Sequence, residues 1–175
     1  MSLLSVGAST QLKMKNAGVQ AMLKYVNFDI VFQEIPDEVT LAINISNCPN
    51  GCPGCHSPFL QKDTGEPLTE NFLESLLSKY GESVTCICFM GGDSAPDEIV
   101  RLARFVHTKT GKIKIGWYSG KQNLPPSFNQ EYFRYIKLGP YIEHLGSLKS
   151  STTNQRLYKI ENGQMTDITS HFFGR

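Results

Sequence analysis

The chain has 175 residues, with 17 Lys and Arg against 16 Asp and Glu and a formal net charge of +1. This length suits one compact domain and excludes a complete eight-fold β/α barrel, which needs about 250 residues. The near-neutral charge offers no excess of cations for a nucleic-acid backbone, so DNA and RNA are not expected partners. With 40% hydrophobic residues, the composition is that of a globular protein with a core.

The first 21 residues contain Lys13 and Lys15 but no acidic residue, and they lack the apolar core and cleavage signal of a targeting peptide. We expect them to form a loosely ordered leader, followed by a single domain over residues 22–175. No hydrophobic run approaches the ~20 residues of a membrane span, so no membrane partner is expected.

From residue 25 onward, extended segments rich in β-branched and aromatic residues alternate with amphipathic helical segments. Thr69 is the predicted N-cap of a first helix, and Gly111 ends a second. The turn Asn162-Gly163 predicts a C-terminal hairpin between residues 157–160 and 165–168. In chain order, the predicted elements before the hairpin are strands at 25–32 and 39–46, a helix at 69–80, a strand at 84–90, a helix at 96–110, and strands at 112–118 and 135–138.

This alternation predicts an α/β fold with a mostly parallel sheet covered by helices. At this length the sheet would form a partial (β/α) barrel. Ligands of such sheets bind at the C-terminal ends of the strands. Two distinctive loops fall there, residues 47–58 and the turn Gly91-Gly92-Asp93. We therefore expect both loops to face one site.

The five cysteines fall into two groups. Cys48, Cys52 and Cys55 have the spacing C-x3-C-x2-C among Pro and Gly residues, so a short loop could wrap three thiolates around one centre. Three such ligands suit an iron–sulfur cluster with one open iron. Zinc, with a fourth and distant ligand, and a disulfide with one thiol left over remain alternatives. Cys86 and Cys88 share one face of an apolar strand and are expected to be buried core thiols. Clustered reduced thiols suit a cytoplasmic protein.

The cysteine spacing resembles the signature of the radical S-adenosylmethionine (SAM) superfamily. The cysteine loop, the Gly91-Gly92-Asp93 turn, the short length and the segment 150–156 together resemble the activating proteins of anaerobic ribonucleoside-triphosphate reductases. The resemblance covers about residues 22–160 and implies a partial barrel of the radical SAM type.

The resemblance also implies the site. Cys48, Cys52 and Cys55 would hold a [4Fe-4S] cluster whose open iron binds SAM. Asp93 would meet the ammonium group of SAM through a charge-assisted hydrogen bond. Family members usually have Pro after this acid, whereas this chain has Ser94. The implied cofactor-binding residues are Gly54, Cys55 and His56 on the adenosine side, Gly91, Gly92 and Asp93 at the methionyl group, and Ser119 after the next strand.

The implied activity is that of an oxidoreductase in which the cofactor carries the chemistry and no further catalytic side chain is required. An electron from the cluster would cleave SAM, and the 5′-deoxyadenosyl radical would remove a hydrogen atom from a glycine of the reductase large subunit. A low-potential electron donor such as flavodoxin would be a second partner. The open side of a partial barrel would admit the reductase loop. The alternatives are another radical SAM enzyme, either an activase of the pyruvate formate-lyase type or a small-molecule enzyme, and a non-catalytic zinc-binding interaction module.

Overall fold

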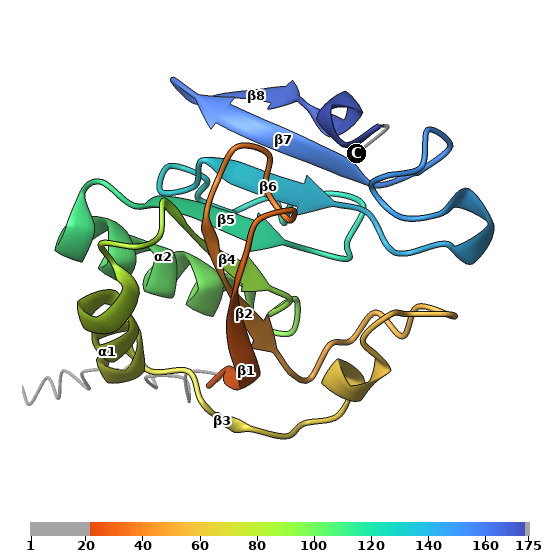
Figure 1. The fold of residues 1–175 in the computed structure, drawn as a ribbon. Coiled ribbons are helices and arrows are strands. Elements are labelled where there is room, and N and C mark those ends of the chain that lie inside the picture. Colours follow the sequence, from red (N-terminus) through yellow and green to blue (C-terminus); the bar gives the residue numbers. More distant parts are fainter. Residues whose placement is uncertain (1–21, 174–175) are drawn as a thin grey trace, which may run out of the picture.

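The computed structural model describes residues 22–173, in which one eight-stranded sheet is accompanied by two α-helices (Figure 1). The expected leader at residues 1–21 lies outside the described residues. The helices are α1 (Glu70–Tyr80) and α2 (Pro96–Thr110). The strands are β1 (Lys24–Val31), β2 (Thr40–Ile45), β3 (Glu66–Pro67), β4 (Cys86–Met90), β5 (Lys114–Tyr118), β6 (Tyr135–Leu138), β7 (Arg156–Glu161) and β8 (Gln164–Asp167).

The sheet is mixed, with the strand order β3-β1-β2-β4-β5-β6-β7-β8. Strands β2, β4, β5 and β6 run parallel, while four of the seven strand pairings are antiparallel. The expected partial (β/α) barrel with a mostly parallel sheet is therefore wrong. Parallel neighbours need long crossovers, usually helical, and residues 22–173 supply only two α-helices. Strands β1 and β2 are joined by residues 32–39, a connection too short for a crossover.

This correction also removes one argument about partners. The open side of a partial barrel, expected to admit a loop of the reductase, has no counterpart in this mixed sheet. The predicted hairpin is present, because β7 and β8 pair antiparallel across Asn162-Gly163. Both turn residues have positive φ, 51° and 76°, as a type I′ turn requires.

Both helices lie together on one side of the sheet (Figure 1). The Thr69 hydroxyl accepts a hydrogen bond from the Phe72 backbone N–H at 3.1 Å, which confirms Thr69 as the N-cap of α1. Gly111, at φ 58°, ends α2 in the left-handed conformation. The apolar stripe of α2 is buried against the sheet. Neither helix in the described part of the chain is long and apolar enough to cross a bilayer.

The opposite face of the sheet is covered by the β1–β2 connection, together with Leu148 and Phe172, rather than by an α-helix. Alternate residues of a strand point to opposite faces, so Ile87 joins the helix side while Cys86 and Cys88 point to the other side. Ile35 of the connection packs there, and a Cβ on Gly116 would stand 2.8 Å from its Cδ1. Both thiols are fully buried, as expected, and burial raises their pKa values. They belong to the core.

Glu38, in the same connection, holds the covering segment to three strands. Its Oε1 accepts hydrogen bonds from Lys114 Nζ and Tyr135 OH, both at 2.6 Å. Its Oε2 accepts one from the hydroxyl of Thr85, which directly precedes β4, also at 2.6 Å. Burial would raise the pKa of Glu38, but these hydrogen bonds outweigh it and lower the pKa. The charged form is therefore the one that stabilises the fold.

We expect Glu38→Ala to lower the free energy of unfolding by about 2–3 kcal/mol at neutral pH, because the buried Tyr135 hydroxyl loses its acceptor and the connection loses its bonds to Lys114 and Thr85. Urea denaturation measures this. A lowered carboxyl pKa contributes stability above its unfolded value of 4.5, and that contribution is lost as the pH falls through the folded pKa. The difference between variant and wild type should therefore shrink below pH 4.5. Glu74→Ala is the control, since Glu74 pairs with Lys109 on the surface and should matter little.

Candidate functional site

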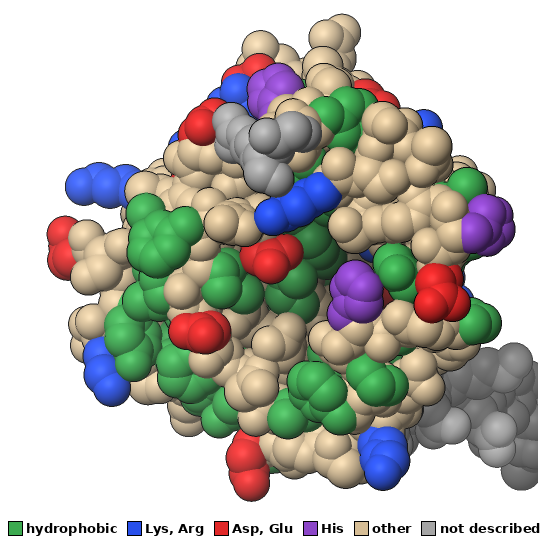
Figure 2. All heavy atoms as spheres, turned by 45° about the vertical axis from the view of Figure 1, so that its right-hand side comes forward, with side chains coloured by type: hydrophobic (Ala, Val, Ile, Leu, Met, Phe, Trp, Pro, Cys, Tyr) green, Lys and Arg blue, Asp and Glu red, His purple; other side chains and the backbone are tan. Residues whose placement is uncertain are grey.

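A pocket of about 460 Å³ lies where the parallel strands end. The loops after β2, β4 and β5 reach it, and so does the long connection between β6 and β7. The loop after β2 and the β6–β7 connection project from the same end of the sheet (Figure 1). The face toward which they point is hollowed in its middle, with acidic, basic and histidine side chains around the hollow (Figure 2). The prediction that the cysteine loop and the Gly91-Gly92-Asp93 turn face one site is confirmed.

Seven of the nine residues that the sequence analysis assigned to the site line this pocket. The other two, Gly54 and Gly92, do not line the pocket but pack closely against neighbouring side chains. A Cβ on Gly54 would stand 3.2 Å from Glu143 Cδ, and one on Gly92 would stand 2.5 Å from Ile99 Cδ1. The seven lining residues are Cys48, Cys52, Cys55, His56, Gly91, Asp93 and Ser119.

Gly92 has a measurable role in the turn. Its φ is +90°, and Ile99 beside it is completely buried. We expect Gly92→Ala to lower the free energy of unfolding by about 3 kcal/mol, because backbone strain and the clash with Ile99 add. Gly163→Ala is the matched control, since its φ of +76° brings strain but no atom lies within 4 Å of the added Cβ. Equal losses in urea denaturation would contradict the packing argument.

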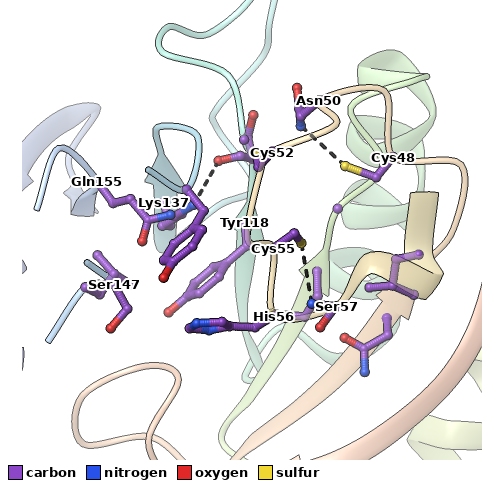
Figure 3. Close-up of a pocket in the computed structure, with 18 of the residues that line it drawn as sticks. Cys48, Asn50, Cys52, Cys55, His56, Ser57, Tyr118, Lys137, Ser147 and Gln155 are labelled. Carbon is purple, nitrogen blue, oxygen red and sulfur yellow. Dashed lines mark hydrogen bonds between the residues drawn. The ribbon is translucent and has the colours of Figure 1, made fainter. Parts of the chain in front are cut away.

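The cysteine loop is anchored to the segment that follows it. The Cys48 backbone N–H donates to Leu60 O at 3.0 Å. Two sulfur atoms accept hydrogen bonds within the loop, Cys48 Sγ from Asn50 Nδ2 at 3.5 Å and Cys55 Sγ from the Ser57 backbone N–H at 3.4 Å (Figure 3). All three thiols are free and partly exposed. The loop therefore presents three unpaired sulfur ligands to one cavity.

This donor set fits a [4Fe-4S] cluster. Within residues 22–173, no three His, Cys, Asp or Glu side chains converge as ligands of a single metal ion. A cluster makes a different demand, because each thiolate binds its own iron and the sulfurs stand farther apart than ligands of one ion. Hydrogen bonds to the ligand sulfurs are a property of cluster sites, and here the sulfurs of Cys48 and Cys55 each accept one.

Asp93 joins three parts of the site. It is 8% exposed, and its Oδ1 accepts a hydrogen bond from Ser119 Oγ at 2.5 Å. Its Oδ2 accepts bonds from the Gly120 backbone N–H at 2.8 Å and from Asn50 Nδ2 at 2.6 Å. The carboxylate thus binds the cysteine loop and the end of β5 to the turn after β4. The ammonium group of SAM, which is expected to meet Asp93, would have to share carboxylate oxygens that already accept hydrogen bonds from Ser119, Gly120 and Asn50.

Lys137 was missed by the sequence analysis. It lies on the side of the pocket opposite the cysteine loop, only 8% exposed (Figure 3). Its Nζ donates to Gly139 O at 2.7 Å and to Ser119 O at 3.4 Å, while an ammonium group has three hydrogens to donate. Burial lowers the pKa of Lys137 to about 8, against the attraction of Asp93 and the three cysteines of the loop. Its signal in the sequence was a cation within a short apolar strand.

The segment 150–156 contributes one residue to the lining of the pocket. Gln155 lines it, beside Lys137 (Figure 3). Its neighbours bind the backbone instead, with Asn154 Nδ2 donating to Pro140 O at 2.9 Å and Arg156 to Thr153 O at 2.6 Å. Of these three residues, only Gln155 is placed to touch a ligand in the pocket.

No protein-family model, curated protein or solved structure matches the chain. The resemblance to the radical SAM activases therefore depends on the cysteine spacing, the glycine turn and the segment 150–156. The observed mixed sheet does not support it. The functional proposal below is therefore based on the residues that line the pocket.

Proposed function

We propose that this chain activates an anaerobic ribonucleoside-triphosphate reductase by generating a glycyl radical in the reductase large subunit, with a [4Fe-4S] cluster and SAM as cofactors. One observation carries the proposal. The three thiols of the C-x3-C-x2-C loop line the same pocket as Gly91, Asp93 and the buried cation Lys137. Three thiols of the kind that ligate iron thus share one cavity with a carboxylate and a buried cation, which would bind the two charged groups of an amino acid.

Cys48, Cys52 and Cys55 would hold the cluster, and the remaining iron would be open to SAM. When bound, these cofactors supply a reductive cleavage that yields a 5′-deoxyadenosyl radical able to take a hydrogen atom from the reductase glycine. The protein itself would bind SAM and orient it. Lys137 offers a charge-assisted hydrogen bond to a carboxylate. Gly91, at φ +103°, lets the backbone approach the ligand closely.

The size and composition of the pocket fit a small polar cofactor. Its volume of about 460 Å³ lies within the range of small-molecule sites. Apolar and aromatic groups such as Ile45, Met90 and Tyr118 line it beside the polar ones. Tyr118 is itself held, since its hydroxyl donates to Glu34 O. A nucleoside attached to an amino acid would match this mixture.

The test begins with anaerobic purification and reconstitution of the chain with iron and sulfide. We expect a brown protein with iron and acid-labile sulfide that cleaves SAM when reduced by a low-potential donor such as flavodoxin. Added to the glycyl-radical ribonucleotide reductase of the same cell, it should produce a glycyl-radical doublet in the electron paramagnetic resonance spectrum. A reductase with its radical-bearing glycine replaced by alanine is the control and should give no doublet.

Two results would contradict the proposal in different ways. Cleavage of SAM without a doublet would indicate another radical SAM enzyme, such as a pyruvate formate-lyase type activase or a small-molecule enzyme. A colourless protein containing stoichiometric zinc would indicate a non-catalytic interaction module.

A further inference from the structure

Asn50 lies inside the cysteine motif but is not one of its ligands. Its side-chain amide has two N–H hydrogens, and Nδ2 lies 2.6 Å from Asp93 Oδ2 and 3.5 Å from Cys48 Sγ. One atom therefore connects the first cysteine of the loop to the carboxylate after β4. Figure 3 shows the amide turned toward the Cys48 sulfur. Leucine, similar in size, would have no hydrogen to give to either partner.

Gly120 provides the space for this amide. A Cβ at Gly120 would stand 2.3 Å from Asn50 Nδ2 and 2.9 Å from its Cγ, closer than any side chain tolerates. The backbone N–H of the same glycine donates to Asp93 Oδ2 at 2.8 Å, so Asn50 and Gly120 share one acceptor atom. The contact between the cysteine loop and the end of β5 thus depends on a glycine in one and an amide in the other.

Asp93 is itself held in place from the other side. Ser119 Oγ donates to its Oδ1 at 2.5 Å, and the Lys121 backbone N–H donates to Ser119 Oγ at 3.0 Å. These hydrogen bonds hold the Asp93 carboxylate in place independently of Asn50. A charged acceptor held in this way binds a neutral donor more strongly than an ordinary carbonyl does.

We propose that Asn50 is a positioning residue that latches the cysteine loop to Asp93 and donates a hydrogen bond to the Cys48 sulfur. The latch places Cys48 and restricts the loop on the side that faces the sheet. The sulfur bond favours the more negative, reduced state of a cluster, because the N–H dipole points its positive end at the ligand. This second part rests on the proposed function, whereas the latch is a property of the chain itself.

The latch is tested on the reduced, cluster-free chain by amide hydrogen exchange. We expect Asn50→Leu to speed the exchange of backbone amides in residues 48–57 while leaving α1 and α2 unchanged. Gly120→Ala should reproduce the effect, because the added Cβ displaces the Asn50 amide although no residue of the loop has been replaced. Asn71→Leu, an exposed position on α1, is the matched control. Unchanged exchange in both Asn50→Leu and Gly120→Ala would overturn the proposal, whatever the chain binds.

The sulfur bond is tested on the reconstituted protein. Loss of an outer partner of a ligand typically weakens metal binding by about 10- to 100-fold, so Asn50→Leu should lose iron to a chelator faster than the wild type. Its cluster should have a more negative midpoint potential, read by spectroscopic redox titration rather than by activity. A cluster with the wild-type potential in Asn50→Leu would overturn the proposal. Failure of the wild type to take up a cluster would count against the proposed function alone, since the exchange experiment needs none.

Discussion

Replacing Cys48, Cys52 or Cys55 by alanine is expected to abolish cluster binding and SAM cleavage. Each thiol would ligate a different iron, so no neighbour can substitute for it. Removal of an outer partner of a ligand typically costs about 10- to 100-fold in metal affinity. Loss of a ligand should cost more. We therefore expect the iron affinity of each variant, measured by competition with a chelator, to lie more than about 100-fold below that of the wild type.

The chain carries its own control for this prediction. Cys88 is a free thiol like the other three, but it is completely buried in the core beneath the β1–β2 connection. Cys88→Ala should cost about 1 kcal/mol of folding free energy through the small cavity it leaves, and should keep its iron. Iron loss in Cys88→Ala equal to that in Cys52→Ala would mean that the loop has no special role.

Replacing Lys137 by methionine should weaken SAM binding by about 10- to 150-fold, because a charge-assisted hydrogen bond contributes about 1.5–3 kcal/mol. Methionine keeps most of the side-chain volume and removes the charge. Equilibrium binding of SAM to reconstituted protein measures the change. Lys149→Met is the control, since Lys149 lies exposed at the pocket and donates to Gln33 Oε1 at 2.9 Å. It should change binding much less.

The pH dependence of binding gives a second test of Lys137. The carboxylate would bind the protonated amine, whose pKa is lowered to about 8 in the free protein. SAM affinity should therefore fall as the pH rises above 8 in the wild type, and this fall should be absent from Lys137→Met. Stability should move in the opposite direction. Between pH 8 and the unfolded value of 10.5 the unfolded chain binds more protons, so the lysine's contribution to the free energy of unfolding rises with pH.

Several elements could be predicted because their signals are local. The Thr69 cap, the Gly111 stop and the Asn162-Gly163 turn are each read from a few neighbouring residues. The amphipathic pattern likewise predicted a helix at 96–110, where α2 lies. Such features depend on backbone geometry and side-chain period within one segment, which the order of the residues determines directly.

The direction of the strands could not be predicted in the same way. Residues 139–155 join β6 to β7 with only a single 3-10 turn, and β7 then returns antiparallel to β6. Nothing in the residues of β7 itself distinguishes a parallel from an antiparallel neighbour. The partial-barrel expectation came from helix and strand alternation in the middle of the chain, and it was extended to the β1–β2 and β6–β7 connections, which contain no α-helix.

The site was predictable where its residues are close in the sequence. The cysteine loop and the turn after β4 were found by their spacing, but Lys137 and Asn50 were not. The importance of Asn50 depends on Asp93, 43 positions away, and on the space above Gly120. That of Lys137 depends on burial opposite the cysteines. Both are tertiary properties, which a spacing rule does not contain.

The walls of the pocket come from segments far apart in the sequence, from Gln33 in the β1–β2 connection to Phe172 after β8, and neither α1 nor α2 contributes to them. The cavity therefore exists only when segments far apart in the sequence, among them Gln155 and Phe172, have come together. A ligand that binds there only in the folded state stabilises that state as a whole, by a free energy that grows with the logarithm of its concentration over its dissociation constant. Binding of a ligand in this pocket would therefore report on the integrity of the described fold as a whole.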